Sequence, residues 1–400
     1  MKIVLVHNSY QQAGGEDVVV AQERRCLERA GHEVVFYSRS NAEIEALAPV
    51  QKLILPKDVV WSSRTRREFT NLLIREAPDL VHIHNTFAVI SPSIYSACRE
   101  RGVPVVQTLH NFRWMCPSAT FFRDGAICEE CSQDGLWRSV CHGCYRGSRP
   151  ASAAVALMLA AHRLLGTWRD SVDTYVALTS FSRAKFIAAG LTAEKIVVKP
   201  NFVDPDPGPR ERAGGYALYV GRLSEEKGLS VLLRAWDNLP AHRLLHVVGD
   251  GPERLRAEAG MRQRAASNIV FHGSLPRDQT IALVKEASFL VVPSLCYEGF
   301  PMVIAEAMAC GTPVICSRLG AMAEIVADRV TGLHFSPGNS TDLFDKVEWA
   351  WSHPSETWEM GRAARLEYES RYTAANNYSL LMQIYERTLN RSVPASRVSN

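Results

Sequence analysis

The sequence predicts an α/β protein with two doubly wound parallel-sheet domains. Short apolar runs alternate with amphipathic segments along most of the chain, which is typical of βαβ units. The 400 residues exceed what one ordinary core accommodates, and a proline-rich segment divides the chain near its middle. With 46% hydrophobic and 22% charged residues, the composition is that of a globular protein.

The first domain is predicted over residues 1–200. Its candidate strands are short buried apolar runs at residues 2–7, 33–38, 80–84, 103–109, 174–178 and 196–199. Amphipathic stretches such as 15–30 and 91–101 lie between them. This alternation predicts a parallel sheet that is covered by helices on both faces.

Residues 201–215 are rich in proline and glycine and are predicted to be a linker. The second domain follows over residues 216–374, with candidate strands at 216–220, 244–248, 269–272, 289–292, 313–316 and 333–335. A helical tail is expected from about 341 to 389, and its last helix, 375–392, is expected to pack on the first domain. Ligands of such sheets bind at the carboxyl ends of the strands, which we expect to face a central cleft.

Charge and cysteine content exclude several classes of protein. The net charge of +3 does not suggest a nucleic-acid-binding protein. Residues 1–7 resemble a buried strand rather than a signal peptide, so ten cysteines indicate thiols or metal ligands. We therefore expect a cytoplasmic protein. Arg64, Arg66 and Arg67 form a basic group that is best explained as a solvated helix face; contact with an anionic membrane face, at the inner membrane, or with a phosphorylated acceptor is the alternative.

A basic turn follows the first strand of the second domain. Gly221 allows a sharp turn, and Arg222 and Lys227 then place two cations beside the helix that begins near Gly228. Two cations at a helix N-terminus can bind a diphosphate. A basic surface loop is the alternative. The turn at Gly249 and Gly251 closes the next strand.

Two carboxylates, Glu298 and Glu306, stand eight residues apart near the end of a later strand. The second lies about two helical turns into the following helix, so both can reach one polar ligand. Backbone amides at the start of this helix can also face phosphate. The residues expected there are Gly299, Phe300 and Pro301.

The two motifs together resemble the GT-B glycosyltransferases of family 4, also called glycosyl transferases group 1. The resemblance covers nearly the whole chain and is strongest over residues 197–337. It implies two Rossmann-like domains, with the phosphates of the donor neutralised by Arg222 and Lys227. It also implies that Glu298 binds the donor sugar, that Glu306 binds the ribose, and that Gly249 and Gly251 approach the nucleotide.

In the first domain, Gly14 and Gly15 resemble the glycine-rich first loop of the family, which lies close to the donor phosphates and the acceptor. His110 matches a family histidine that sits beside the reacting sugar. The alternative for such a histidine at a strand end is a packed core residue. For His82 and His84, which end the preceding strand, we expect core packing at least as readily as function.

An insertion over residues 111–150 contains two Cys-x2-Cys pairs, Cys128 with Cys131 and Cys141 with Cys144. Four such thiolates suit a structural zinc ion, and Cys116 is a substitute for Cys141. The short gap between the pairs lowers the specificity of the pattern. Free thiols are the alternative.

The resemblance implies a metal-independent, retaining hexosyltransferase. It would move a sugar from a nucleoside-diphosphate donor of the UDP or GDP type to a saccharide or lipid-linked acceptor of surface polysaccharide synthesis. The candidate catalytic residues are His110, Glu298, Arg222 and Lys227. An Asp-x-Asp metal motif at a strand end is missing, so no catalytic cation is expected. An inactive nucleotide-sugar-binding scaffold and a sugar epimerase are the alternatives.

Overall fold

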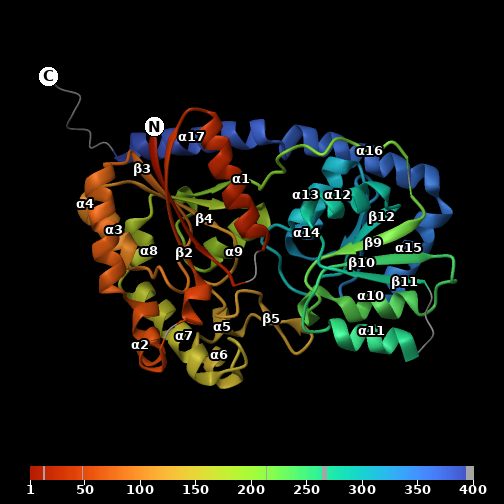
Figure 1. Ribbon diagram of the computed structural model, residues 1–400, viewed down its shortest axis with the longest axis horizontal. Helices are drawn as coiled ribbons and strands as arrows, with labels where there is room; N and C mark the ends of the chain where they lie inside the picture. Colours follow the sequence, from red (N-terminus) through yellow and green to blue (C-terminus); the bar gives the residue numbers. More distant parts are fainter. Residues whose placement is uncertain (12–13, 47, 213, 264–267, 393–400) are drawn as a thin grey trace. The chain divides into compact units, whose positions relative to one another are not determined.

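The computed structural model describes residues 1–11, 14–46, 48–212, 214–263 and 268–392. The chain forms two compact units. The first unit comprises Met1–Phe121, Cys128–Pro200 and the described residues from Asn377 onward, and the second comprises Phe122–Ile127 and Asn201–Asn376. Figure 1 labels the elements of both.

The first unit is built on a six-stranded sheet in the order β2-β1-β3-β4-β7-β8, in which every pairing is parallel. Every residue of β3 and β4 is buried, including polar ones such as His82 and Gln107, because helices cover both faces of the sheet. The strands are β1 (Lys2–Ser9), β2 (Glu33–Ser40), β3 (Leu80–Asn85), β4 (Val105–Leu109), β7 (Thr174–Ala177) and β8 (Ile196–Val198).

Side-chain caps begin several helices of the first unit. Ser62 accepts a hydrogen bond from the Thr65 amide, and Thr179 accepts one from the Ser182 amide. The helices are α1 (Gly15–Arg29), η1 (Asn41–Ile44), α2 (Pro49–Val60), α3 (Ser63–Glu76), α4 (Ser93–Arg101), α5 (Glu130–Gln133), α6 (Trp137–His142), α7 (Arg149–Leu164), α8 (Thr167–Ser171), α9 (Ser180–Ala188) and η2 (Ala193–Lys195).

The long helix α17 (Ala374–Ser392) ends the described chain, and most of it belongs to the first unit. Its Leu381, Ile384 and Tyr385 are buried in one hydrophobic cluster with the sheet residues Ile3 and Leu80. This burial of apolar surface stabilises the attachment of the helix.

The second unit contains another wholly parallel six-stranded sheet, in the order β11-β10-β9-β12-β13-β14. In chain order this is 3-2-1-4-5-6, the strand order of the Rossmann fold. The strands are β9 (Tyr216–Val220), β10 (Leu244–Val248), β11 (Ile269–Gly273), β12 (Phe289–Val292), β13 (Val314–Ser317) and β14 (Gly332–Phe335).

Helices cover this sheet and form a large core with it that includes Trp236 and Phe289. They are η3 (Glu225–Lys227), α10 (Leu229–Trp236), α11 (Arg254–Gln263), α12 (Arg277–Glu286), α13 (Met302–Cys310), α14 (Gly320–Ile325), α15 (Ser340–Ser352) and α16 (Pro354–Arg371). The predicted helical tail is therefore three helices, α15, α16 and α17 (Figure 1).

The structure and the comparisons below confirm the predicted α/β class, and the predicted strands differ from the observed ones by at most two residues at either end. Two features were not anticipated. A small hairpin, β5 (Phe122–Arg123) and β6 (Ala126–Ile127), leaves the insertion and belongs to the second unit. Within the predicted proline-rich linker, Phe202 and Val203 are buried, and the Val203 amide donates to the Tyr372 carbonyl oxygen at 3.0 Å.

Gly228 is predicted to be essential for stability. Its φ is +73°, and a Cβ there would lie 1.9 Å from the carbonyl oxygen of Pro293. We expect Gly228→Ala to lower the free energy of unfolding of the second unit by roughly 2–4 kcal/mol, measured by urea denaturation.

The matched control is Gly260→Ala in α11, where a Cβ meets nothing within 4 Å. Since alanine favours a helix interior, this change should be neutral or stabilising by up to about 1 kcal/mol. Equal stability of the two variants would contradict the strain argument.

Candidate functional site

The motifs of the second unit meet where the strand order reverses. Strands β9 and β12 are neighbours, and the connections leave them toward opposite sides of the sheet. Ligands of open α/β sheets bind at the carboxyl ends beside such a switch point. The loop after β9 carries Arg222 and Lys227, and the loop after β12 carries Glu298.

These two loops are joined by close contacts. The Leu295 amide donates to the Glu226 carbonyl oxygen at 2.8 Å. The Lys227 ammonium lies 2.5 Å from Glu298 Oε1, which also accepts a hydrogen bond from the Ser294 hydroxyl at 2.8 Å. Glu298 therefore does not sit on the strand end itself but is held across the loop by a lysine and a serine.

Charge in this site is only partly balanced. Burial would lower the pKa of Lys227, but the Glu298 carboxylate outweighs burial and raises it above the ordinary value, so Lys227 stays cationic. Arg222 is exposed, and its guanidinium has no protein partner in the described part of the chain. One cation is thus held in place and a second is open to a ligand.

Glu306 lies in the second turn of α13 and is paired with Arg277, the first residue of α12. The Arg277 Nε lies 3.0 Å from Glu306 Oε1, and the Glu306 side chain is 15% exposed. Burial raises the pKa of Glu306, although Arg277 favours its ionised form. Sequence reasoning missed Arg277, because its position at a helix start has no signal of its own.

Gly249 and Gly251 have a structural reason to be glycine. A Cβ at Gly249 would lie 1.9 Å from the Gly221 carbonyl oxygen, and one at Gly251 would lie 2.4 Å from that of Leu223. The two turns therefore pack backbone against backbone. Phe300 and Pro301 are buried at the start of α13, where the Phe300 ring lies 5.7 Å from that of Tyr372.

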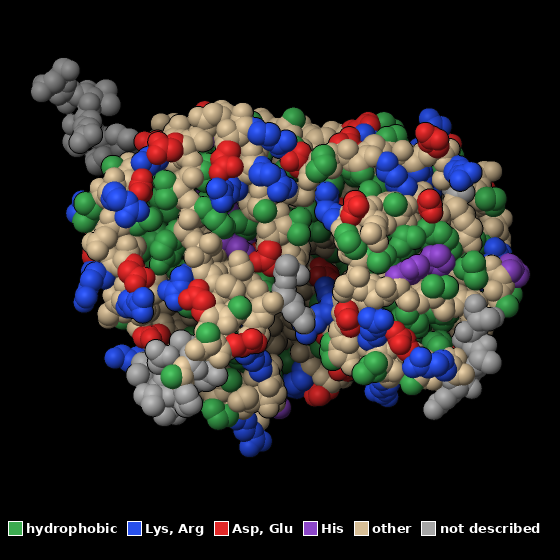
Figure 2. All heavy atoms as spheres, viewed as in Figure 1, with side chains coloured by type: hydrophobic (Ala, Val, Ile, Leu, Met, Phe, Trp, Pro, Cys, Tyr) green, Lys and Arg blue, Asp and Glu red, His purple; other side chains and the backbone are tan. Residues whose placement is uncertain are grey.

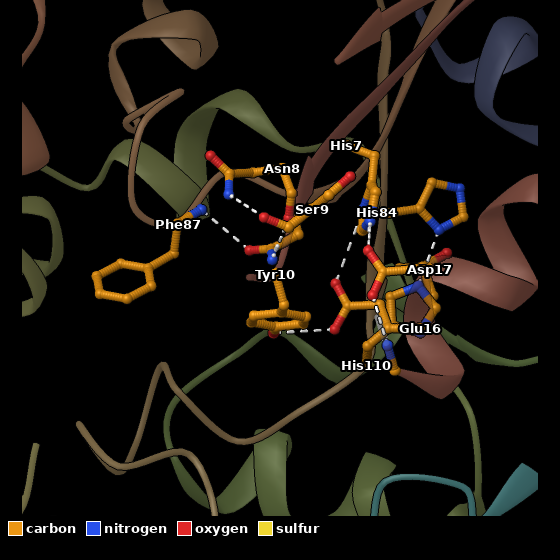
Figure 3. A network of polar contacts seen from close by, with 12 residues as sticks. His7, Asn8, Ser9, Tyr10, Glu16, Asp17, His84, Phe87 and His110 are labelled. Carbon is orange, nitrogen blue, oxygen red and sulfur yellow. Dashed lines mark hydrogen bonds and ion pairs between the residues drawn. The ribbon is translucent and has the colours of Figure 1, made fainter. Parts of the chain in front are cut away.

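The sheet of the first unit has its own switch point, between β1 and β3. His7 near the end of β1 is buried, and its Nε2 lies 2.9 Å from Asp17 Oδ1. The Tyr10 hydroxyl donates to Glu16 Oε2 at 3.1 Å, and the Asn111 amide donates to Tyr10 at 3.1 Å. Figure 3 shows how the side chains of His7, Tyr10, Glu16 and Asp17 lie close together.

The pKa values of the two acids at the start of α1, Glu16 and Asp17, are shifted in opposite directions. Burial raises the pKa of Glu16 to about 7, although His7 and the Tyr10 hydroxyl favour its ionised form. Burial also acts on Asp17, but the hydrogen bonds from His7 and the Gly14 amide prevail and lower its pKa. Since the Gly14 amide already donates to Asp17 at 2.8 Å, a phosphate there would have to displace that carboxylate.

His110 ends a buried chain of polar contacts. Its Nε2 lies 2.8 Å from His84 Nδ1, and His84 Nε2 lies 3.2 Å from Glu23 Oε1. Glu23 Oε2 in turn lies 3.0 Å from the Lys199 ammonium. Although burial would raise the pKa of Glu23, Lys199 and His82 lower it well below its usual range.

Glu23, His82 and His84 form the one group of three potential metal ligands in the described residues whose ligand atoms all lie within 4.8 Å. A metal fits poorly, because the Lys199 ammonium already neutralises Glu23 and both ring nitrogens of His82 have hydrogen-bond partners, Tyr385 and Thr108. The group is a buried ion-pair network.

A small hollow in the first unit adjoins this chain and has about 40 Å³ of space that a water-sized group can enter. Its polar side includes His110, Asn111 and Arg113, and its apolar side includes Trp114 and Trp168. The two tryptophan rings stack with their centroids 4.7 Å apart. The hollow therefore suits a ligand with both polar and apolar surface.

Four cysteines of the insertion are close to one another. Cys131 is buried, and burial together with nearby Cys116, Cys144 and Cys128 raises the pKa of its thiol to about 12. Cys141 is exposed. No three cysteine sulfurs of the described residues lie within 4.8 Å of one another.

Surface charge is mixed. Figure 2 shows basic and acidic side chains interspersed over the visible face of each unit. Arg64 and Arg66 are paired with Glu68 and Glu100. Within the described ranges no helix combines the length and apolar character needed to cross a membrane.

Two family models match the chain. Residues 13–207 match the model described as Glycosyltransferase Family 4, and residues 208–367 match that of Glycosyl transferases group 1. Together they span most of the sequence. The chain therefore belongs to the group 1, family 4 glycosyltransferases, as the motifs had indicated.

Named relatives agree with this assignment. An uncharacterized glycosyltransferase of Methanocaldococcus jannaschii is 35% identical over 132 residues, which is 33% of this chain and only 37% of that relative. The 2-deoxystreptamine glucosyltransferase of Streptomyces kanamyceticus is 27% identical over 83% of both chains. The D-inositol 3-phosphate glycosyltransferase of Mycolicibacterium smegmatis is 25% identical over 94% of this chain and 87% of its own.

Solved structures show the same fold. Sucrose-phosphate synthase from Thermosynechococcus elongatus superposes with a TM-score of 0.71 at 19% identity, covering 98% of this chain and 99% of its own. Anabaena HepE in complex with UDP-glucose superposes with a TM-score of 0.69 at 18% identity, covering 97% and 100%. The fold is GT-B.

The structure thus brings Lys227 together with Glu298 and places Arg222 in the same loop, as their sequence positions had suggested. It adds Ser294 and Arg277 in the second unit, and Glu16, Glu23 and Lys199 in the first. Glu23 follows Glu16 by two helical turns on the same face of α1. An acid repeated on one face of a helix was the signal that could have revealed it.

The opposite shifts of Glu16 and Asp17 predict a distinctive pH dependence of stability. With a folded pKa of about 7 against an ordinary 4.5, Glu16 loses its proton more readily in the unfolded chain, so its contribution is lost as pH rises through this window. We expect Glu16→Gln to abolish a loss of roughly 3 kcal/mol in unfolding free energy between pH 4.5 and 7.5.

Urea denaturation across this pH range provides the measurement. Asp17→Asn is the control of opposite sign, because a lowered folded pKa stabilises the protein above the ordinary pKa and the variant should be weaker at neutral pH. Identical pH profiles for the wild type and Glu16→Gln would contradict a raised pKa of Glu16 in the folded protein.

Proposed function

We propose that this protein is a retaining glycosyltransferase that moves a sugar from a nucleoside-diphosphate sugar to a saccharide or lipid-linked acceptor. The observation that carries the proposal is the 2.5 Å pair of Lys227 and Glu298 at the switch point of the second sheet, with Arg222 open beside it. An anchored cation, an open cation and an acid on adjoining loops suit a diphosphate that is linked to a hydroxylated sugar.

In this proposal Lys227 keeps Glu298 as a partner and donates its remaining N–H groups to the diphosphate. Arg222 binds the same phosphates from its exposed position. Charge builds up on the departing diphosphate as the bond to the sugar breaks, so two fixed cations lower the barrier. Glu298 is proposed to hold the donor sugar, and His110 is proposed as a further catalytic residue.

Glu306 is proposed to hold the ribose of the nucleotide. Its carboxylate is already positioned by Arg277, and a buried acceptor of this kind suits the two hydroxyls of a ribose. Gly299, Phe300 and Pro301 lead into α13, whose first amides can face phosphate. Binding needs no catalytic divalent cation in this scheme.

Known relatives support a nucleotide-sugar donor. HepE of Anabaena has been crystallised with UDP, with UDP and glucose, and with UDP-glucose. We therefore propose a donor of the UDP or GDP type. Synthesis of a surface polysaccharide in the cytoplasm, with peripheral contact at the membrane, is the proposed setting.

Lys227→Ala should lower turnover by roughly two orders of magnitude, because the charge that develops on the leaving diphosphate then lacks its anchored cation. The measurement is release of nucleoside diphosphate from the donor. Lys346→Ala, which removes a surface lysine paired with Asp342 in α15, is the control and should leave turnover unchanged.

Donor identity is tested in parallel by thermal shift with UDP-glucose, UDP-galactose and GDP-mannose. The true donor class should raise the melting temperature of the wild type by mass action and do so less for Glu298→Ala. Unchanged turnover in Lys227→Ala would remove Lys227 from this role. A shift with a nucleotide sugar but no turnover in the wild type would favour the binding scaffold, and no shift with any of the three would contradict the proposed donor class.

The zinc site stays a prediction, and the neighbours of Cys131 favour Cys116 over Cys141 as the fourth ligand. We expect about one zinc per chain by metal analysis of purified protein. Cys131→Ser should remove the metal, whereas Cys141→Ser, at an exposed position, should retain it. Zinc well below one equivalent in the wild type would contradict the site.

A further inference from the structure

We propose that Glu23 and His84 act as positioning residues that hold His110 in the tautomer protonated on Nε2, so that His110 Nδ1 is a fixed hydrogen-bond acceptor for a ligand hydroxyl. The ligand is the sugar substrate if the proposed function holds. The tautomer itself follows from contacts within the first unit and does not depend on that function.

The chain of polar contacts that leads to His110 begins at the ionised carboxylate of Glu23. Glu23 lies 3.0 Å from the Lys199 ammonium and 3.1 Å from His82 Nδ1, and all three side chains are at most 2% exposed. A buried carboxylate beside a buried ammonium is ionised, because neither charge is otherwise compensated. Glu23 is therefore an acceptor only.

This acceptor decides where His84 carries its proton. His84 Nε2 lies 3.2 Å from Glu23 Oε1, a charge contact, and neither atom completes a hydrogen bond within the described structure. Burial and nearby His82 lower the pKa of His84 to about 3, so the ring has a single proton at neutral pH. A proton on Nε2 faces the carboxylate, whereas a bare Nε2 would oppose lone pair to lone pair.

The proton on His84 Nε2 then decides the state of His110. With Nε2 protonated, His84 Nδ1 is a bare acceptor 2.8 Å from His110 Nε2. A hydrogen bond at this distance requires the proton to come from His110 Nε2. Burial, followed by His84 and His7, lowers the pKa of His110, so the ring is neutral and its Nδ1 is bare.

His110 Nδ1 remains accessible. His110 is only partly buried and lines the hollow, and its Nδ1 has no protein partner in the described part of the chain. A bare ring nitrogen accepts a hydrogen bond from a hydroxyl and opposes a carboxylate or phosphate oxygen. The hollow is therefore selective at this point for a neutral, hydroxyl-bearing group such as a sugar hydroxyl.

The test is nitrogen NMR of protein labelled with ¹⁵N-histidine at neutral pH, without substrate. His110 signals are assigned by their loss in His110→Gln. We expect a protonated Nε2 and a bare Nδ1. A proton on Nδ1 would overturn the proposal, whatever the enzyme turns out to transfer.

Two variants at His84 separate positioning from folding. His84→Asn can keep an acceptor oxygen near the Nδ1 position, so the His110 tautomer should persist. His84→Leu removes the acceptor, and His110 should then populate both tautomers. Thermal unfolding of both variants identifies any general loss of structure.

Steady-state kinetics of the two His84 variants provide a second test. If the proposed function is right, His84→Leu should lower kcat about ten- to hundredfold with little change in KM, and His84→Asn should recover most of it. A persistent Nε2 tautomer in folded His84→Leu would show that His84 does not set it, and would overturn the proposal. Loss of all transfer in the wild type with the expected tautomer would instead contradict only the proposed function.

Discussion

Both sheets are wholly parallel, and this constraint places the carboxyl end of every strand in a sheet at the same edge. Residues that are far apart in the chain therefore meet without any need for a local motif. In the second unit this brings Lys227, after β9, to Glu298, after β12. In the first unit it brings His7, His84 and His110 together from β1, β3 and the end of β4.

The charged side chains of the two units differ in how far they are buried and paired. In the first, Glu23 and Lys199 are fully buried, so each must compensate the other. In the second, Lys227 and Glu298 are partly exposed and Arg222 is open to solvent. A closed network fixes geometry, whereas an open one leaves binding capacity for an anion. This contrast is the basis for proposing a positioning role in the first unit and phosphate binding in the second.

Glycine shows how one residue type can serve two purposes. Gly228, Gly249 and Gly251 stand in motifs that resemble nucleotide-binding turns, yet each meets protein backbone where a Cβ would be. Because these glycines have no side chain, the neighbouring loops can approach one another closely. The loops then hold Lys227 and Glu298 at contact distance. Tight backbone packing is therefore the physical basis of the charged site.

Periodicity and turn residues determined the fold class and the strands, because burial of alternating elements leaves a local signature in the chain. The Gly221–Gly228 and Glu298–Glu306 motifs likewise indicated the family, and the structure brings Lys227 and Glu298 from these motifs into contact. Tertiary structure alone decided the partners of these residues: Arg277 for Glu306, Lys199 for Glu23, and His84 for His110. Such pairs join residues 26 to 176 positions apart, and a long-range contact between charges has no local pattern that a sequence can display.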